Sequence, residues 1–151
     1  MEDKEALAKE LRLDRQLCFA LYGASLALTR TYKPLLEPLG LTYPRYLAML
    51  VLWETDGVPV KALGERLGLD SGTLSPLLKR LEQAGYVTRQ RDRADERQVT
   101  VSLTPAGAAL KAKAVEVMAA IGVATGCSLE EMAALRDRLQ ALRDRLQAAQ
   151  G

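Results

Sequence analysis

The segment from Val60 to Leu103 restricts the fold more than any other part of the chain, because it changes from helical to extended patterns within a short distance. Val60–Leu67 has the apolar spacing of a short helix, and Gly68–Ser71 supplies a tight turn with a capping residue. A second helix follows, with leucines along one face between Leu74 and Leu81, and it ends before Gly85.

Two extended segments come next. Val87–Arg91 is the first, and Gln98–Leu103 alternates polar and apolar residues with the period of a strand. The charged residues Asp92–Arg97 between them predict a hairpin tip, and Thr104 followed by Pro105 is a strong helix start. A helix, a tight turn, a second helix and a charged hairpin together predict a winged helix-turn-helix.

One local rule is broken in the second helix of this segment. Pro76 lies inside the helix if it begins at Ser71, whereas local rules favour a start with Ser75 as the cap and Pro76 as the first residue. A proline near the first turn loses little hydrogen bonding, so we prefer the longer helix.

The flanking regions are mainly helical in pattern. A helix is expected from about Leu13 to Glu37, and Tyr43–Pro44 opens another whose apolar run Tyr46–Trp53 predicts burial. Asp56–Pro59 predicts a turn. An alanine-rich helix should run from Thr104–Pro105 to about Ala124, where Gly126 interrupts it.

The C-terminus repeats seven residues without change, as Ala134–Gln140 and again as Ala141–Gln147. Leu135, Leu139, Leu142 and Leu146 therefore form a heptad seam. The seam predicts packing within a dimer; the alternative is an ordinary amphipathic helix folded onto its own chain. We expect a mostly α fold with a small β-hairpin wing, divided into an N-terminal dimerisation and sensor segment (1–43), a winged helix-turn-helix (44–103) and C-terminal dimerisation helices (104–151).

The 151 residues include no histidine and only two cysteines. This composition excludes histidine-based nucleophilic catalysis and the common zinc sites, so any chemistry of this chain depends on thiols, hydroxyls or charge. We expect no metal, no cofactor and no enzymatic activity. The N-terminus lacks a signal-peptide pattern and no apolar run approaches the length of a membrane span. We therefore expect a cytoplasmic protein without a membrane partner, whose two cysteines are free thiols.

The net charge of +2 comes from the centre of the chain. Lys61–Arg97 holds eight basic and six acidic residues, whereas the rest holds 13 of each. Small polar residues at the start of the second helix suit base edges in the major groove of duplex DNA, basic residues further along suit phosphates, and long arginines at the hairpin tip suit an adjacent minor groove. The candidate DNA-binding residues are Ser71, Gly72, Thr73, Ser75, Lys79, Arg80, Arg93 and Arg97.

The stretch Leu63–Gly85, with the wing segment Asp92–Leu103 and the Leu103–Gly107 corner, resembles the multiple-antibiotic-resistance regulators (MarR family). The resemblance covers nearly the whole chain. It implies a homodimer that binds a pseudo-palindromic operator in double-stranded DNA. It also implies that Arg97 enters the minor groove and that Asp95 holds the wing in shape.

Leu13–Tyr22 and Gly40–Trp53 are similar to the organic hydroperoxide resistance regulators (OhrR), the peroxide-sensing branch of that family. In that branch the cysteine matching Cys18 reacts with peroxide, and the tyrosines matching Tyr32 and Tyr43 hydrogen-bond to it. Some members carry a resolving cysteine near the position of Cys127 and form an intersubunit disulfide, whereas others carry one cysteine and use a small external thiol. This chain is similar to the two-cysteine members, which implies that Cys127 is the resolving thiol. Cys127 also precedes a capping box at Ser128, where a helix N-terminus favours negative charge.

Spacing adds an independent observation about the thiol. Cys18, Tyr22, Ser25, Thr29 and Tyr32 share one stripe of the first long helix. Tyr22 is one turn from Cys18, but Tyr32 is fourteen residues on, roughly 21 Å along a straight helix. If the family contact holds, Tyr32 must come from the partner subunit.

The expected function is a repressor that binds operator DNA when reduced and releases it when organic hydroperoxide oxidises Cys18. One alternative is a MarR-type repressor that responds to a small aromatic ligand, with incidental cysteines. Another is a thiol peroxidase with Cys18 as the reactive residue, against which the complete winged helix argues.

Overall fold

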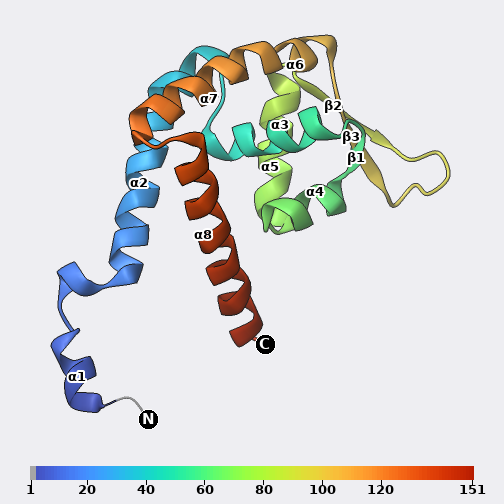
Figure 1. The fold of residues 1–151 in the computed structure, drawn as a ribbon. Coiled ribbons are helices and arrows are strands. Elements are labelled where there is room, and N and C mark those ends of the chain that lie inside the picture. The colour runs from blue at the N-terminus through green and yellow to red at the C-terminus, as the bar shows by residue number, and fades with distance from the viewer. Residues whose placement is uncertain (1–2) are drawn as a thin grey trace. The chain divides into compact units, whose positions relative to one another are not determined.

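The structure is a computed structural model that describes residues 3–151 (Figure 1). The chain forms two compact units, divided in the sequence between Lys113 and Ala114. The first unit contains both the N-terminal helices and the predicted winged helix-turn-helix. The division into dimerisation and DNA-binding segments remains a prediction, since it concerns roles rather than compactness.

The N-terminal region contains α1 (Lys4–Lys9), a 3-10 helix η1 (Leu13–Arg15), α2 (Leu17–Leu36) and a second 3-10 helix η2 (Glu37–Leu39). The expected helix start at Leu13 is wrong by four residues, because Gln16 is extended and separates η1 from α2. Its side-chain amide donates hydrogen bonds to the carbonyls of Glu10 (2.7 Å) and Arg12 (3.3 Å). This local hydrogen bonding competes with helix continuation.

The core of the first unit lies around α3 (Tyr43–Glu54) and the two helices after it. As predicted, Tyr46, Ala48, Met49, Val51 and Leu52 are buried on α3. The helix-turn-helix consists of α4 (Val60–Leu67) and α5 (Ser71–Gln83), and the predicted leucine stripe of α5 is buried. Burial of this stripe orients the opposite face of α5 toward solvent.

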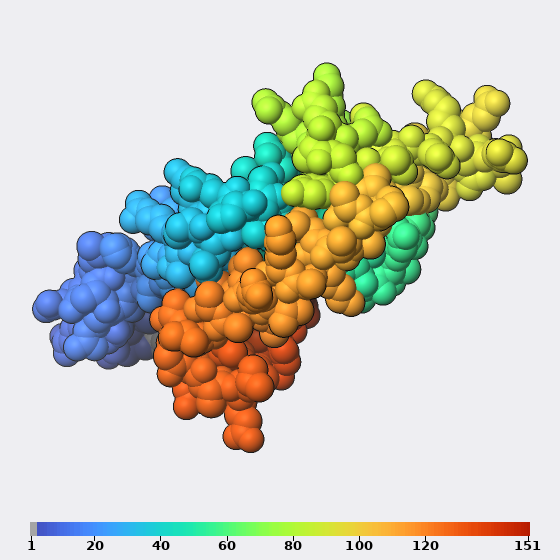
Figure 2. All heavy atoms as spheres, turned by 90° about the horizontal axis from the view of Figure 1, so that it is seen from above, coloured from blue at the N-terminus to red at the C-terminus, as the bar shows by residue number. Residues whose placement is uncertain are grey.

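A three-stranded antiparallel sheet completes the module, with strand order β1–β3–β2. The hairpin strands β2 (Val87–Arg91) and β3 (Val99–Leu103) pair with Val87 opposite Leu103. The short strand β1 (Val58–Pro59) corrects the expectation of a simple turn at Asp56–Pro59. One oxygen of the Asp56 carboxylate accepts the Leu103 N–H (2.8 Å) and so holds this turn beside β3. In the space-filling view the hairpin tip, in yellow, extends beyond the helices of its unit (Figure 2).

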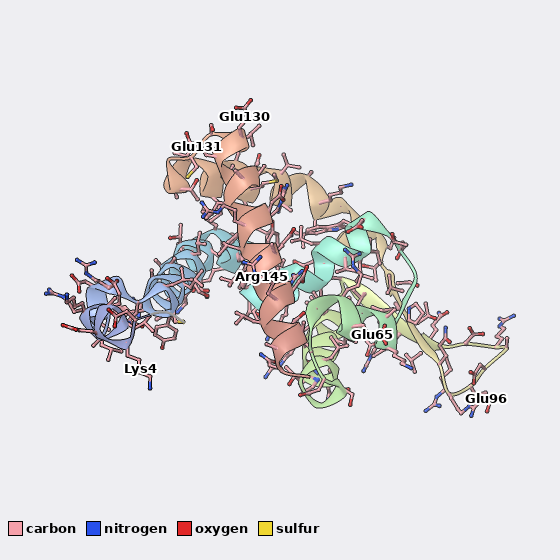
Figure 3. All side chains as sticks on the ribbon, turned by 60° about the horizontal axis from the view of Figure 1, so that its bottom comes forward. Lys4, Glu65, Glu96, Glu130, Glu131 and Arg145 are labelled. Carbon is pink, nitrogen blue, oxygen red and sulfur yellow. The ribbon has the colours of Figure 1, made fainter. Side chains whose placement is uncertain are left out.

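The remaining helices are α6 (Pro105–Ala109), α7 (Lys111–Thr125) and α8 (Leu129–Ala149). Thr104 caps α6 as predicted, with its hydroxyl accepting the Gly107 N–H. The alanine-rich helix is divided at Leu110 into two helices, which the pattern did not indicate. Ser128 caps α8 by accepting the Glu131 N–H (3.1 Å). Glu130 and Glu131 lie in the first turn of α8, where negative charge interacts favourably with the helix dipole (Figure 3).

The mostly helical fold with a small antiparallel sheet confirms the predicted fold class. No single helix within residues 3–151 is long and apolar enough to cross a membrane. Pro105–Thr125 and Leu129–Ala149 meet that criterion of length and composition only when they are taken together as a bent pair.

Candidate nucleic-acid interface and thiol sensor

The turn between α4 and α5 is held by backbone geometry that its sequence dictates. Gly68 adopts a left-handed conformation (φ 68°), and the Leu69 N–H donates to the Gly64 carbonyl (3.0 Å). A β-carbon at Gly64 would lie 2.9 Å from the Leu69 carbonyl oxygen, so this close approach requires glycine. The turn is therefore a rigid corner that orients α5 against α4.

Asp70 marks the start of α5. Its carboxylate accepts the Thr73 N–H (2.8 Å), and this hydrogen bond holds the pKa of the Asp70 carboxyl below its usual value. The helix consequently begins at Ser71, as we preferred, and Pro76 lies inside it. Pro76 removes only the hydrogen bond that would reach Gly72.

The exposed face of α5 carries the predicted base-edge and phosphate residues. All of them are exposed in this unit: Ser71, Gly72, Thr73, Ser75, Lys79 and Arg80. The small polar residues lie in the first turns, and the two basic residues follow toward the C-terminal half. This arrangement allows close approach of the helix N-terminus to a polar surface, with cations further along.

The wing tip is ordered by its own hydrogen bonds. Asp92 N–H donates to the Gln98 carbonyl (2.8 Å), and Gln98 N–H donates to the Asp95 carbonyl (3.0 Å). The Asp95 carboxylate accepts the Arg97 N–H (3.1 Å) and lies 3.3 Å from the Arg97 guanidinium. The Arg97 side chain is 93% exposed, so this ion pair leaves it free to reach a ligand. Arg93 is exposed at the same tip.

An ion pair that sequence reasoning missed joins α5 to the wing. The Glu82 carboxylate accepts hydrogen bonds from both the backbone N–H and the guanidinium of Arg89, each at 3.2 Å. The guanidinium bond lowers the pKa of the Glu82 carboxyl. The two residues lie on opposite sides of the Gly85 turn, and nothing in their sequence spacing indicates that they meet.

A groove of about 670 Å³ separates the helix-turn-helix from the base of the hairpin. It brings together Ser71 and Ser75 of α5 with Arg97 of the wing, three residues predicted from sequence, and adds Lys61 and Arg89. The groove is not uniformly basic, because Glu65 lies on its α4 side (Figure 3). The helix face and the wing are therefore neighbours on one surface.

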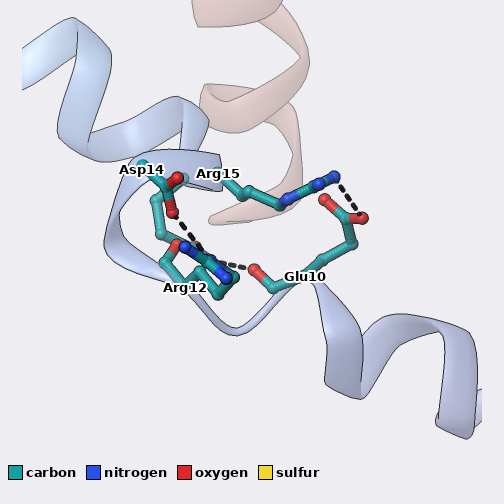
Figure 4. A network of polar contacts seen from close by, with 5 residues as sticks. Glu10, Arg12, Asp14 and Arg15 are labelled. Atoms are coloured by element: carbon teal, nitrogen blue, oxygen red, sulfur yellow. Dashed lines mark hydrogen bonds and ion pairs between the residues drawn. The ribbon is translucent and has the colours of Figure 1, made fainter.

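Cys18 is the second residue of α2 and is exposed as a free thiol. Tyr22, one turn along, is also exposed. The loop that leads into α2 is tied by ion pairs between Arg12 and Asp14 and between Arg15 and Glu10, each at 3.1 Å (Figure 4). The thiol therefore lies beside an ordered, charged turn at the start of a long helix.

The tyrosines predicted for the sensor lie in a cluster near the other end of α2. The ring centroids of Tyr32 and Tyr43 are 4.9 Å apart, and Tyr46 lies 5.6 Å from Tyr32. Burial, with Tyr46 and Tyr43 nearby, raises the pKa of Tyr32 to about 12. The Tyr32 phenol therefore stays protonated at neutral pH, and its O–H is available as a hydrogen-bond donor. Sequence reasoning missed Tyr46 as a member, although its spacing of three from Tyr43 places both on one helix face.

Cys18 and Tyr32 are not brought together within one chain. Both lie on α2, which is continuous between them, so the fourteen residues correspond to roughly 21 Å of helix. The second thiol, Cys127, lies between α7 and α8 in the other unit and is half-buried. Its S–H donates to the Thr125 carbonyl (3.6 Å), and its N–H donates to the Thr125 hydroxyl (3.3 Å).

Among residues 3–151 there is no group of three or more histidine, cysteine, aspartate or glutamate side chains that could hold a metal ion. The described part of the chain thus offers two kinds of chemistry: a polar and cationic surface on α5 and the wing, and two free thiols.

Comparisons with known proteins bear on both the polar, cationic surface and the two thiols. A family model for "Transcriptional regulator SarA/Rot" matches residues 30–114. The chain is 50% identical over 129 residues to the organic hydroperoxide resistance transcriptional regulator of Bacillus subtilis, a match that covers 85% of this chain and 88% of that protein. It is 55% identical over 127 residues to the HTH-type transcriptional regulator TtmR of Methylorubrum extorquens, covering 84% of this chain but only 65% of that protein's length.

Solved structures of other regulators also match this chain. Reduced AbfR bound to DNA superposes with a TM-score of 0.80 and 34% identity, covering 95% of this chain and 98% of that one. AbfR, a protein of Staphylococcus epidermidis, also matches in its disulfide-formed state with a TM-score of 0.67 and 35% identity, covering 93% of this chain and 98% of that one. Both of these relatives in sequence are named transcriptional regulators, not enzymes.

Proposed function

Because the chain belongs to the organic hydroperoxide resistance branch of the MarR family of transcriptional regulators, we propose that it is a repressor controlled by the oxidation state of Cys18. Reduced protein binds operator DNA, and oxidation by an organic hydroperoxide releases it. The observation that carries this proposal is the exposed free thiol of Cys18 at the start of α2. We place the protein in the cytoplasm, where its DNA target lies.

The DNA-binding part of the proposal rests on the shared surface of α5 and the wing. The major groove of B-DNA is about 12 Å wide and admits a helix. The small residues from Ser71 to Ser75 are proposed to approach base edges, while Lys79 and Arg80 neutralise phosphates. Arg97, exposed at the tip, is proposed to enter the adjacent minor groove, with Asp95 supporting the loop. The DNA-bound state of AbfR supports this assignment.

A homodimer is part of the proposal because long apolar surfaces on α2 and α8 lack cover in the described chain. Leu17, Phe19 and Leu28 are exposed on α2. On α8, where no residue is buried, the seam leucines Leu135 and Leu146 are both more than half exposed. A second copy would cover such surfaces and present two wings to a pseudo-palindromic operator.

The same dimer would complete the sensor. Because Tyr32 is too far from Cys18 of its own chain, we propose that Tyr32 and Tyr43 of one protomer face Cys18 of its partner. Their phenolic O–H groups then donate hydrogen bonds that stabilise the thiolate, with Tyr22 as a neighbour on the thiol's own helix. Exposed Leu17 and Phe19 beside Cys18 favour alkyl and lipid hydroperoxides as substrates.

The proposed chemistry has two steps. The Cys18 thiolate attacks the terminal oxygen of the hydroperoxide, the O–O bond breaks, and the alkoxide takes a proton and leaves as an alcohol. The resulting sulfenic acid then condenses with the thiol of Cys127, which forms a disulfide and releases water. The disulfide-formed state of AbfR supports this second step as an analogy.

The test is operator binding through one redox cycle, measured by fluorescence anisotropy on DNA from upstream of the gene. We expect tight binding by reduced protein, loss after stoichiometric cumene hydroperoxide, and recovery after dithiothreitol. Cys18→Ser should bind DNA and ignore the peroxide, whereas Cys127→Ser should still react but form no disulfide. Peroxide-induced release of the Cys18→Ser variant would contradict the mechanism.

A second candidate function is release by a small aromatic acid with incidental cysteines. A cavity of about 330 Å³ favours it, since Leu36, Leu41 and Tyr43 line it beside two cations, Arg30 and Lys33, and one acidic residue, Glu37. Such a site would hold an aromatic ring against the apolar wall and a carboxylate beside the basic groups. Salicylate-induced release that persists in a chain with both cysteines replaced by serine would favour this alternative.

A further inference from the structure

We propose that Tyr86 is a positioning residue that couples the sensor helix to both DNA-reading elements, α5 and the wing. The inference rests on the redox function proposed above and concerns how a change at α2 reaches the DNA-binding surface. Tyr86 lies just after α5 and directly before β2, so it occupies the junction of the two elements.

The side chain of Tyr86 reaches back to the end of the sensor segment. Its hydroxyl donates a hydrogen bond of 2.6 Å to the carbonyl of Leu39, and this contact is partly buried. Leu39 is itself buried and closes η2, which continues directly from α2. Within residues 3–151, no other hydrogen bond or ion pair joins the residues before Leu41 to those after Pro59. One hydroxyl thus makes the polar connection between the two regions.

The backbone of Tyr86 ties the same residue to α5 and to the wing. Its N–H donates to the Leu81 carbonyl at the end of α5 (3.1 Å). Its carbonyl accepts the Thr104 N–H (3.0 Å), directly after β3, while the Thr104 hydroxyl donates to the neighbouring Gly85 carbonyl (2.5 Å). A displacement of Tyr86 would therefore move the helix end and the wing base together.

Close packing makes this junction stiff. Gly107 of α6 lies against the Tyr86 backbone, and a β-carbon there would overlap the Tyr86 carbonyl oxygen. The Trp53 indole N–H also donates to the Gly107 carbonyl (2.9 Å), which anchors α6 to α3. Because tightly packed junctions transmit displacement rather than absorb it, Tyr86 is suited to carry a shift of η2 to both DNA-reading elements.

Removing the hydroxyl should weaken the coupling between oxidation and DNA release. In Tyr86→Phe the hydrogen bond to Leu39 is absent in both the reduced and the oxidised protein. The position of α2 and η2 then has less influence on the positions of α5 and the wing. We therefore expect the ratio of oxidised to reduced Kd to fall about three- to tenfold relative to wild type, the range that one hydrogen bond supports.

The experiment measures operator Kd for reduced and hydroperoxide-oxidised full-length protein, in wild type, Tyr86→Phe and Glu54→Ala. Glu54→Ala is the control, because it removes another side-chain contact between elements of the same unit, the ion pair with Arg66 of α4 (3.0 Å), and involves neither η2 nor Tyr86 nor Gly107. It should leave the Kd ratio unchanged. Circular dichroism establishes that each variant is folded.

The outcomes separate the two proposals. A wild-type Kd that ignores oxidation would reject the redox function, and this inference with it. A wild-type ratio well above one, with an equal ratio in Tyr86→Phe, would reject only the role of Tyr86. A reduced ratio in both Tyr86→Phe and Glu54→Ala would also overturn the proposal, because the effect would then follow general loosening of the unit.

Discussion

Gly107 occupies a position where the corner after the wing has no room for a side chain, since a β-carbon would overlap the Tyr86 carbonyl oxygen. We expect Gly107→Ala to destabilise the protein by at least roughly 1–3 kcal/mol, the usual cost of overpacking. Urea unfolding followed by circular dichroism measures this change. Gly122→Ala is the control, because the nearest atom would be 3.9 Å away and helical alanine is favourable. Equal effects of the two substitutions would contradict the steric argument.

Asp70 links the stability of α5 to pH. Its pKa is lowered in the folded protein by the Thr73 N–H, so its stabilising contribution is complete above about pH 4 and is lost as pH falls through the lowered pKa. Asp70→Asn keeps a capping oxygen but cannot titrate. We expect its urea midpoint to fall less than that of wild type on acidification, although Glu82, with its pKa lowered by Arg89, still contributes acid sensitivity. An unchanged pH profile would show that Asp70 does not contribute.

Two substitutions at the wing tip separate the effect of charge on DNA binding from the effect of loop order. Asp95 accepts the Arg97 N–H, whereas the side chain of Glu96 contacts no hydrogen-bond partner within residues 3–151 (Figure 3). Both substitutions, Asp95→Ala and Glu96→Ala, remove one negative charge from the same tip. We expect Asp95→Ala to weaken operator binding, because the loop that presents Arg97 loses its support, while Glu96→Ala leaves binding unchanged or tighter. Anisotropy titrations at one salt concentration measure both, and tighter binding by Asp95→Ala would contradict this role.

The elements that were predictable from sequence are those whose signals are local. Thr104 followed by Pro105 indicated the start of α6, and the leucine spacing indicated the buried face of α5. The two-residue strand β1 was missed, because two residues have no periodicity and its pairing partner, Thr100–Val101, is remote in sequence. The extended Gln16 was missed for a similar reason: its side chain interrupts a helical pattern through hydrogen bonds that composition does not reveal.

In the candidate site, too, local features were predictable from sequence and contacts between elements were not. The stripe of Cys18 and Tyr22 and the polar start of α5 follow from helix periodicity alone. The contacts between elements do not: Glu82 with Arg89, and Tyr86 with Leu39, join residues whose approach depends on how the helices pack. Sequence therefore predicted which residues share an exposed helix face better than it predicted which residues join neighbouring elements.

For the whole molecule, the exposed seam of α8 predicts that assembly and DNA binding are lost together. We expect Leu139→Glu to produce monomers, because it places a charge in the proposed dimer seam, and to weaken operator binding by at least tenfold. Gln140→Glu adds the same charge one residue off the seam and should remain dimeric. Analytical ultracentrifugation and anisotropy on the same samples measure both properties. A Leu139→Glu dimer with normal affinity would place the interface elsewhere.

The continuous helix α2, with Cys18 at one end and Tyr32 near the other, has a genetic consequence if each sensor uses one residue from each protomer. A Cys18→Ser allele and a Tyr32→Phe allele would each produce an impaired regulator when expressed alone. In a mixed dimer both lesions fall in one sensor, and the other contains an intact Cys18 and an intact Tyr32. Two defective copies of the gene would thus complement each other within a single cell, and half of the sensing capacity of each mixed dimer would be restored.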